Sequence, residues 1–404
     1  MAHSFSIKNT LKKNTMLLAL VVILVLFQVL IVSFNKGSLL NPANISNIIS
    51  QNAYVVILAT GMLLCILTGG NIDLSIGSVV CLVGAVAGTL IVSMHMNIYL
   101  AMVLCLLVGI CIGAWQGFWI AFIRIPPFIV TLAGMLLWRG VAMIILNGLT
   151  ISPFPADYLK YFTSFLPTTV DTPDNDAATA ATASFVYMVT MTVAALACAL
   201  FIVSQVIDRI NKKRKGYDVE SLIVMIFRLV LLSAVVMIIG WFLGQHKGIP
   251  VVLILLAVIV LAYSYFTTKT VPGRHLYALG GNEKAAKLSG IDTNKVLFFA
   301  YTNMGFLSAV AALACVARFN SAFPAAGPNY ELDAIGACFI GGASAYGGTG
   351  TVGGAIVGAI FMGVLNNGMS ILGIDANWQK AVKGMVLLLA VVFDILSKKR
   401  AKSK

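Results

Sequence analysis

Six polar residues stand where a membrane protein could use them to move a polar solute. Three of them, Asn71, Asp73 and Ser75, follow a Gly-Gly pair that interrupts an apolar segment. Polar groups at membrane depth are costly, so they face protein or a water-filled cavity, and transporters often build such cavities at interrupted helices. We therefore predict a hydrated translocation path lined by Asn71, Asp73, Ser75, Arg139, Asn366 and Asn367. For Asp73 and Arg139, a structural salt bridge or helix-end contact is equally compatible with the sequence.

Three further ionisable residues, Arg228, Lys383 and Asp394, also fall in apolar segments. They lie near the ends of those segments, where long side chains can reach the interface. We interpret them as anchors.

A second pattern lies in a polar segment between two apolar ones, and it predicts a short capped helix. Asn282 is a favourable N-cap, and Glu283 complements the positive end of a helix dipole. Ala285, Ala286 and Leu288 then favour helix, and Gly290 can end it in the left-handed conformation. Such a helix in a solvent-facing loop has no purpose in lipid, so we expect a partner protein to bind it.

The remaining chemistry-bearing residues indicate neither an enzyme nor a metalloprotein. The seven cysteines lie in apolar segments without a CxxC pair, and the four histidines are scattered, so we predict no metal site. No GxxxxGK[ST] phosphate-binding loop is present. We expect no cofactor, and any ATP-driven step would require a separate ATPase chain.

The composition indicates whether the segments that carry these residues lie in water or in lipid. Of the 404 residues, 60% are hydrophobic and 10% are charged, with a mean hydropathy of +0.97. A soluble domain has about 25% charged residues, so a lipid bilayer is the expected surroundings. We predict an all-α, polytopic membrane protein forming one permease domain over 1–404, with about 10–12 transmembrane helices including broken or re-entrant segments. Twelve apolar stretches support this: 16–34, 49–68, 75–94, 98–123, 127–147, 183–206, 222–243, 249–267, 296–317, 334–346, 353–373 and 379–396. Because 334–346 is too short to span, we interpret it as a half-helix.

The net charge of +13 is distributed as a membrane protein requires, which argues against nucleic-acid binding. If both termini are cytoplasmic, most lysines and arginines fall on the inner side, as the positive-inside rule demands. This orientation makes 147–184 a periplasmic loop, 207–221 a basic cytoplasmic loop and 268–295 a cytoplasmic loop. The basic run 208–215 is explained by contact with anionic lipid headgroups, and a regulatory or ATPase contact is the alternative.

A weak internal repeat links residues 65–79 and 338–352. Each contains a Gly-Gly pair after an apolar run, followed by Gly-Ser-Val or Gly-Thr-Val. The two segments would form a parallel repeat of the kind found in transporters, although glycine-rich sequences also produce such matches by chance.

Three of these motifs together resemble permeases of the ribose/xylose/arabinose/galactose type of bacterial ABC importer. They read TGGNIDLSIGS (68–78), ALGGNEKAAKLSGI (278–291) and IGGASAYGGTGTVGGAIVGAIFMGVLNNGMSILG (340–373). The resemblance implies an inner-membrane homodimer, a periplasmic sugar-binding protein and a cytoplasmic ATPase with two nucleotide-binding halves in one chain.

The resemblance also implies that 282–290 is a coupling helix within the coupling loop 268–295. In the Glu-Ala-Ala-x-x-x-Gly pattern of ABC importers, Ala285, Ala286 and Gly290 match, whereas Lys284 displaces Glu283 by one residue. The chain is longer than the ribose type, by an apparent helix pair around 208–215. That length looks more like the xylose or multiple-monosaccharide branch.

Three other functions were weighed against an ATP-driven sugar importer. An ion-coupled secondary transporter needs a buried carboxylate or a sodium site, and we expect Asp73 to be essentially the single buried acid, with every glutamate in a loop. A membrane-embedded enzyme lacks clustered acid–base residues. An ABC permease for a nucleoside or another small solute remains open within the same superfamily.

Overall fold

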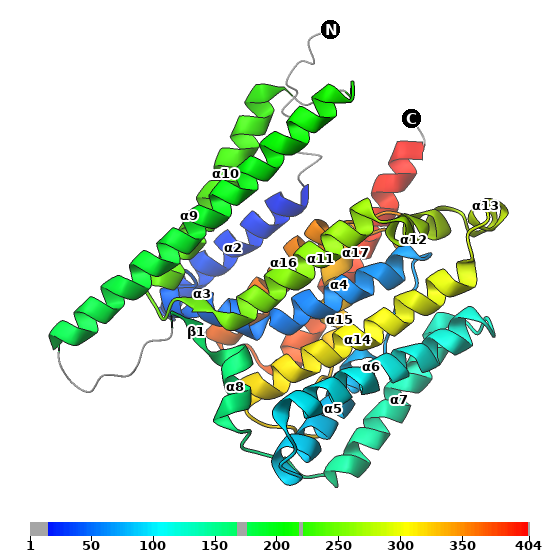
Figure 1. Ribbon diagram of the computed structural model, residues 1–404, viewed down its shortest axis with the longest axis horizontal. Helices are drawn as coiled ribbons and strands as arrows, with labels where there is room; N and C mark the ends of the chain where they lie inside the picture. Colours follow the sequence, from blue (N-terminus) through cyan, green and yellow to red (C-terminus); the bar gives the residue numbers. More distant parts are fainter. Residues whose placement is uncertain (1–14, 168–175, 218–220, 403–404) are drawn as a thin grey trace.

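The computed structural model describes residues 15–167, 176–217 and 221–402, and almost all of this part is helical (Figure 1). Nine spans in the described part are long and apolar enough to cross a membrane. In chain order these are α2 (Thr15–Ser33), α5 (Ile76–Ala87) with its π-helical extension η1 (Gly88–Ser93), α6 (Ile98–Ala121), α7 (Pro127–Leu146), α9 (Asp176–Arg214), α10 (Leu222–Gly244), α11 (Val251–Lys269), α14 (Thr293–Phe319) and α16 (Val352–Leu372).

A bent pair, α3 (Pro42–Gln51) and α4 (Ala53–Leu67), provides a tenth candidate span with a 40° bend. The predicted all-α polytopic fold with broken helices is therefore confirmed. Two of the twelve predicted stretches, 334–346 and 379–396, are not among these ten. They correspond to the short helix α15 (Tyr330–Ile340), which begins earlier than predicted, and to α17 (Ala376–Lys402).

The predicted loops 147–184 and 207–221 both contain regular secondary structure in their described residues. The segment 147–184 contains α8 (Ala156–Thr163), the strand β1 (Phe165–Leu166) and the first turns of α9, and β1 pairs with β2 (Ile249–Pro250). Its residues 168–175 lie outside the described ranges. Helix α9 continues through most of the basic run 208–215, because lysine and arginine are good helix formers. The connection in 207–221 is correspondingly short.

Helix α4 forms the centre of the bundle. Each of its residues is buried, and it packs against α14, α15 and α16 (Figure 1). A helix that is apolar on all sides is either surrounded by other helices or exposed to lipid. The apolar sequence AYVVILATGMLLCIL is compatible with both, and its Gly61, where an added methyl group would meet Met304 and Leu307, indicates close packing against α14.

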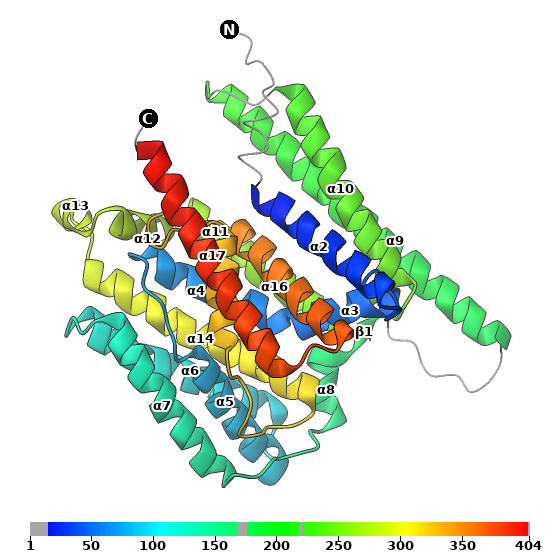
Figure 2. The same cartoon turned by 180° about the vertical axis from the view of Figure 1, so that it is seen from behind.

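The α9–α10 hairpin lies at one side of the bundle, next to α2 (Figures 1 and 2). Its outer face is apolar, with Leu200 71% exposed and Ile223 79% exposed. Exposed apolar surface on this scale is incompatible with water and is expected where helices face lipid tails.

The two ends of the bundle differ in the segments they gather. One end holds the start of α2, the end of α9, the end of α17, and the helices α12 (Val271–Gly281) and α13 (Glu283–Leu288) (Figures 1 and 2). The opposite end holds α3, α8 and the β1–β2 pair. The predicted coupling loop and the basic end of α9 therefore lie at the same end.

Candidate functional site

The segment 268–295 folds into two short helices joined at one residue. The hydroxyl of Thr270 accepts a hydrogen bond from Gly273 N at 3.2 Å and caps α12. Asn282, in an extended conformation, ends α12, and its side chain accepts a bond from Ala285 N at 3.0 Å to begin α13. Gly290 follows with φ +83°, a conformation that favours glycine. The predicted capped helix between Asn282 and Gly290 is thus present.

Helix α13 offers nearly all of its surface to solvent. Only Ala286 is buried, at 4% exposed, whereas Leu288 is 90% exposed. Fully burying a leucine side chain is worth about 1.5–3 kcal/mol. Leu288 is therefore an exposed apolar side chain, at a polar end of the molecule, that a partner could bury.

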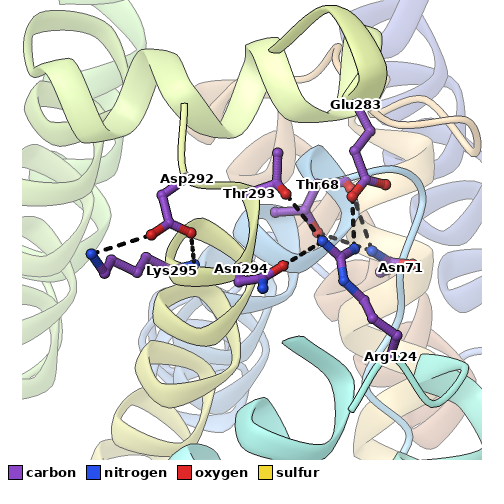
Figure 3. A network of polar contacts seen from close by, with 8 residues as sticks. All are labelled: Thr68, Asn71, Arg124, Glu283, Asp292, Thr293, Asn294 and Lys295. Atoms are coloured by element: carbon purple, nitrogen blue, oxygen red, sulfur yellow. Dashed lines mark hydrogen bonds and ion pairs between the residues drawn. The ribbon is translucent and has the colours of Figure 1, made fainter. Parts of the chain in front are cut away.

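Arg124, in the turn between α6 and α7, holds α13 against the start of α14 (Figure 3). Its guanidinium forms an ion pair with Glu283 at 2.7 Å and donates to Thr293 Oγ1 at 3.0 Å and to Asn294 Oδ1. From the sequence, no role beyond a positive charge was predicted for Arg124. Its partners lie far along the chain, so spacing gave no signal for this network.

Asp292 begins α14 beside this network, and its partners are local. Its side chain accepts from Lys295 N at 3.1 Å and forms an ion pair with Lys295 Nζ at 3.2 Å. These bonds favour the carboxylate and lower the pKa of Asp292 below its usual value, with the bond from the Lys295 amide as the largest cause.

The break after α4 organises a buried polar cluster that includes two predicted path residues. Asp73 Oδ1 accepts from Ser75 N at 2.9 Å and from Ser75 Oγ at 2.7 Å. With its amide oriented to satisfy all neighbours, Gln116 donates to Asp73 Oδ2 at 3.2 Å and accepts from Trp138 Nε1 at 3.2 Å. The cluster joins α5, α6 and α7. Asn71 lies in the turn itself, where its side chain donates to Thr68 Oγ1 at 3.1 Å.

The other predicted path residues lie elsewhere. Arg139, on α7, donates to the carbonyl oxygens of Pro324, at 3.1 Å, and Ala326, which anchors the segment between α14 and α15. Asn367, on α16, exchanges two hydrogen bonds of 2.9 Å with Asn44 on α3. Asn366 keeps a buried Oδ1 without a hydrogen-bond partner among the described residues. The hydrogen bonds of the described part do not join these positions to the 71–75 cluster, so their role in a path stays a prediction.

A cavity of about 190 Å³ is lined by residues of α3, α4, α8, α11 and α14. Its polar lining includes Asn47, Gln51, Tyr54 and Arg318, and the Arg318 guanidinium donates to the carbonyl oxygen of Gln51 at 3.2 Å. The six predicted path residues do not line this cavity.

A buried ion pair overturns two expectations from the sequence. Lys383, on α17, lies 2.9 Å from Asp333 on α15, with side-chain exposures of 14% and 1%. Tyr54 on α4 donates to the same carboxylate at 2.7 Å. Asp73 is therefore not the single buried acid, and Lys383 is not an anchor at a span end. Asp333 was missed because it immediately precedes the apolar stretch, in the first turn of α15.

The expectation that every glutamate lies in a loop is wrong for Glu331. Glu331 falls in the first turn of α15 and Glu283 in the first turn of α13, whereas Glu220 lies outside the described residues. A negative charge in the first turn complements the helix dipole. Glu331 therefore lies in a helix that begins earlier than the predicted stretch 334–346, whereas Glu283 begins the short helix predicted within the loop 268–295.

The fold and this site define a multi-pass membrane permease, and comparison with known proteins assigns its family. Residues 44–391 match the family "Branched-chain amino acid transport system / permease component". The xylose transport system permease protein of Escherichia coli K12 is 37% identical over 365 residues, which cover 90% of this chain and 88% of that protein. Its counterpart from Haemophilus influenzae is 35% identical over 397 residues, covering 98% and 100%. The ribose import permease protein of Escherichia coli K12 is 34% identical over 388 residues, covering 96% and 95%. No solved structure matches the chain.

This chain belongs to that permease family, and within it to the ribose/xylose type of ABC importer permease. Members of this family are transporter subunits rather than enzymes, and a permease of this class works with an ATPase and a binding protein.

Removing Arg124 should loosen α13 without unfolding the bundle. In Arg124→Ala, we expect faster hydrogen exchange of the α13 amides, because the ion pair to Glu283 and the bonds to α14 are lost. The pair is 42% and 47% exposed, and exposed pairs contribute about 0–1 kcal/mol, so thermal unfolding should barely change. Lys295→Ala, which removes an ion pair on the same surface but none to α13, is the control. Equal exchange in both variants would contradict the role of Arg124.

Removing Lys383 should destabilise the protein strongly. Lys383→Met leaves the buried Asp333 carboxylate unpaired, which costs about 3–5 kcal/mol, and thermal unfolding in detergent should report the loss. The double variant with Asp333→Asn should recover most of the stability. Lys380→Met, which changes an exposed lysine of the same helix, should have little effect. A single variant as stable as the native protein would show that the pair is not holding α15 and α17 together.

Proposed function

We propose that this chain is the membrane-spanning permease of an ATP-driven importer that translocates a monosaccharide of the xylose or multiple-sugar type. The observation that carries the proposal is its similarity, over 98% of its length, to a xylose transport system permease protein. A periplasmic binding protein would deliver the sugar. The apparent extra helix pair that suggested the xylose branch corresponds to the α9–α10 hairpin.

The proposed assembly contains two copies of this chain and an ATPase that has two nucleotide-binding halves in one polypeptide. The chain lies in the bacterial inner membrane with both termini in the cytoplasm. This orientation is supported by the gathering of the basic end of α9, the helices α12 and α13, and the end of α17 at one end of the bundle (Figures 1 and 2). Short loops rich in lysine and arginine stay in the cytoplasm.

Helix α13 is the proposed coupling element, with Asn282, Glu283, Ala285, Ala286, Leu288 and Gly290 forming or shaping its surface. Asn282 and Gly290 fix the ends of the helix, and the buried Ala286 seats it on the rest of the protein. Leu288 points away from the protomer, at 90% exposed. An apolar side chain on a short, well-defined helix fits a groove on a partner protein.

The proposed path is formed where helices are interrupted, and alternating access occurs at the interface between two copies of the permease. Asn71, Asp73, Ser75, Arg139, Asn366 and Asn367 are its candidate polar residues. The buried Oδ1 of Asn366, which has no hydrogen-bond partner among the residues that the structure describes, supports a place for that residue, because such an atom costs free energy unless a solute or water bonds it. A sugar requires several modest hydrogen bonds, since a tight site would prevent release.

Uptake by the reconstituted system is the first test. The chain would be placed in proteoliposomes with its ATPase and binding protein, and uptake of labelled xylose, ribose, galactose and arabinose measured with and without ATP. We expect uptake to require ATP and all three proteins, with xylose among the substrates. A branched-chain amino acid and a nucleoside serve as competitors. Uptake by this chain alone, driven by a proton or sodium gradient, would contradict the importer function and favour an ion-coupled transporter.

A charge at Leu288 tests the role of α13. Leu288→Asp should reduce ATP-dependent uptake by at least about tenfold, because desolvating an unpaired carboxylate in the groove costs more than 1.4 kcal/mol. Leu288→Met, which keeps an apolar side chain, should retain most of the activity. Gly290→Arg, which places a side chain at φ +83°, should give the same loss as Leu288→Asp. Co-purification of the ATPase with each variant shows whether the ATPase still docks, which distinguishes a docking defect from a failure of the variant to insert into the membrane. Normal docking of the ATPase on Leu288→Asp would exclude this surface as the contact.

A further inference from the structure

Three segments that are distant in sequence meet backbone to backbone beside α13. They are the end of α4 with its Gly-Gly break, the loop between α15 and α16, and the last turn of α12. The amide of Gly348 donates to the carbonyl oxygen of Leu67 at 3.1 Å, which joins the first two. A methyl group on Gly70 would overlap the carbonyl oxygen of Ala345, and one on Gly347 would overlap the backbone of Gly69. The two helix breaks are therefore in direct main-chain contact.

The last turn of α12 closes against the same place. A methyl group on Gly280 would overlap the carbonyl oxygen of Leu67 and would lie 2.5 Å from Gly348 N. The hydroxyl of Tyr277, one turn earlier, donates to the carbonyl oxygen of Gly350 at 2.9 Å. Because main-chain atoms have no rotamers to yield, such a contact transmits displacement more directly than a contact between flexible side chains.

Helix α12 is also fixed to the rest of the bundle, and only Asn282 separates it from α13. Its side chains Leu276 and Leu279 are 0% and 3% exposed. A displacement of α13 must therefore move α12, and with it the contact at Gly280. The alternative route through Arg124 and Glu283 is an exposed ion pair, and such pairs transmit little energy.

We propose that Gly280, Gly348 and Tyr277 form a backbone junction that carries the displacement of α13 to both helix breaks at once. They are positioning residues for transport: they contact neither ATP nor the transported solute, and they act by keeping the three segments together. The inference rests on the proposed importer function, because it assigns the route by which an ATPase docked on α13 would reach the interrupted helices.

The test compares two neighbouring glycines. In Gly280→Ala, the methyl group forces α12 away from Leu67 and Gly348, whereas in Gly281→Ala the methyl group meets nothing within 4 Å. Both residues have backbone conformations open to alanine, since neither has a positive φ. The native chain and both variants would be reconstituted with the ATPase and binding protein, and sugar imported per ATP hydrolysed would be measured.

We expect the ATPase to co-purify with Gly280→Ala and to hydrolyse ATP, because α13 itself is unchanged. Sugar imported per ATP should fall at least about fivefold, the lower range of a coupling free energy between two sites. Hydrogen exchange of the Gly348 amide should accelerate in this variant alone. Gly281→Ala should keep the native ratio. A native ratio in Gly280→Ala would overturn the junction.

Tyr277→Phe keeps the proposal falsifiable if Gly280→Ala does not assemble. This variant loses the hydrogen bond from the Tyr277 hydroxyl to the Gly350 carbonyl. A fall of about twofold or more in sugar imported per ATP supports the junction, whereas an unchanged ratio overturns it. A native chain without ATP-dependent uptake overturns the importer function and the junction together. If the native chain shows ATP-dependent uptake and the assembled variants import as much sugar per ATP as the native chain, only the junction is overturned.

Discussion

A backbone amide or carbonyl that leaves a helix within a bilayer cannot bond to water, so another part of the protein must supply its partner. In this chain, the loop between α15 and α16 supplies such a partner to the end of α4: the Gly348 amide donates to the carbonyl oxygen of Leu67. This approach leaves no room for side chains, as the overlap of a Gly70 methyl group with Ala345 demonstrates. The arrangement of α4, α5, α15 and α16 depends on this main-chain contact.

The same constraint acts on buried side chains. Asp73 accepts hydrogen bonds from Ser75 and Gln116, and Asp333 is held by the Lys383 ion pair and a hydrogen bond from Tyr54. These groups hold helices together in the conformation described. A path for a polar solute through such a protein therefore requires that some of these bonds rearrange, or that a surface shared with a second copy contributes. Interrupted helices make rearrangement less costly, because their ends already lack part of the regular hydrogen bonding.

The two kinds of exposed apolar surface have different physical meanings. The outer face of the α9–α10 hairpin extends along a whole helix pair and suits lipid tails. Leu288 stands alone on a six-residue helix among charged residues, at the end of the bundle where the basic run lies. An isolated apolar side chain on a rigid, capped helix suits a protein partner rather than a membrane.

The sequence by itself determined the features that depend on local order along the chain. Composition predicted the bilayer, apolar stretches predicted most of the spans, and the order Asn282, Glu283, Gly290 predicted the ends of α13, because capping involves residues within one turn. The motif around Gly69 and Gly70 indicated a broken helix. The family also followed from motifs in the sequence, and the comparisons confirmed it.

Only the tertiary structure decided which distant residues are partners. Tyr54 and Asp333 are separated by 279 positions, and Arg124 and Glu283 by 159. No period or spacing encodes such pairs, so Lys383 was misread as an anchor and Asp333 was overlooked. Gly280 precedes the predicted capped helix, and no role of its own was predicted for it from the sequence. Its close approach to Leu67 arises only when α12 packs against the end of α4, because contact between main chains is determined by how whole helices meet.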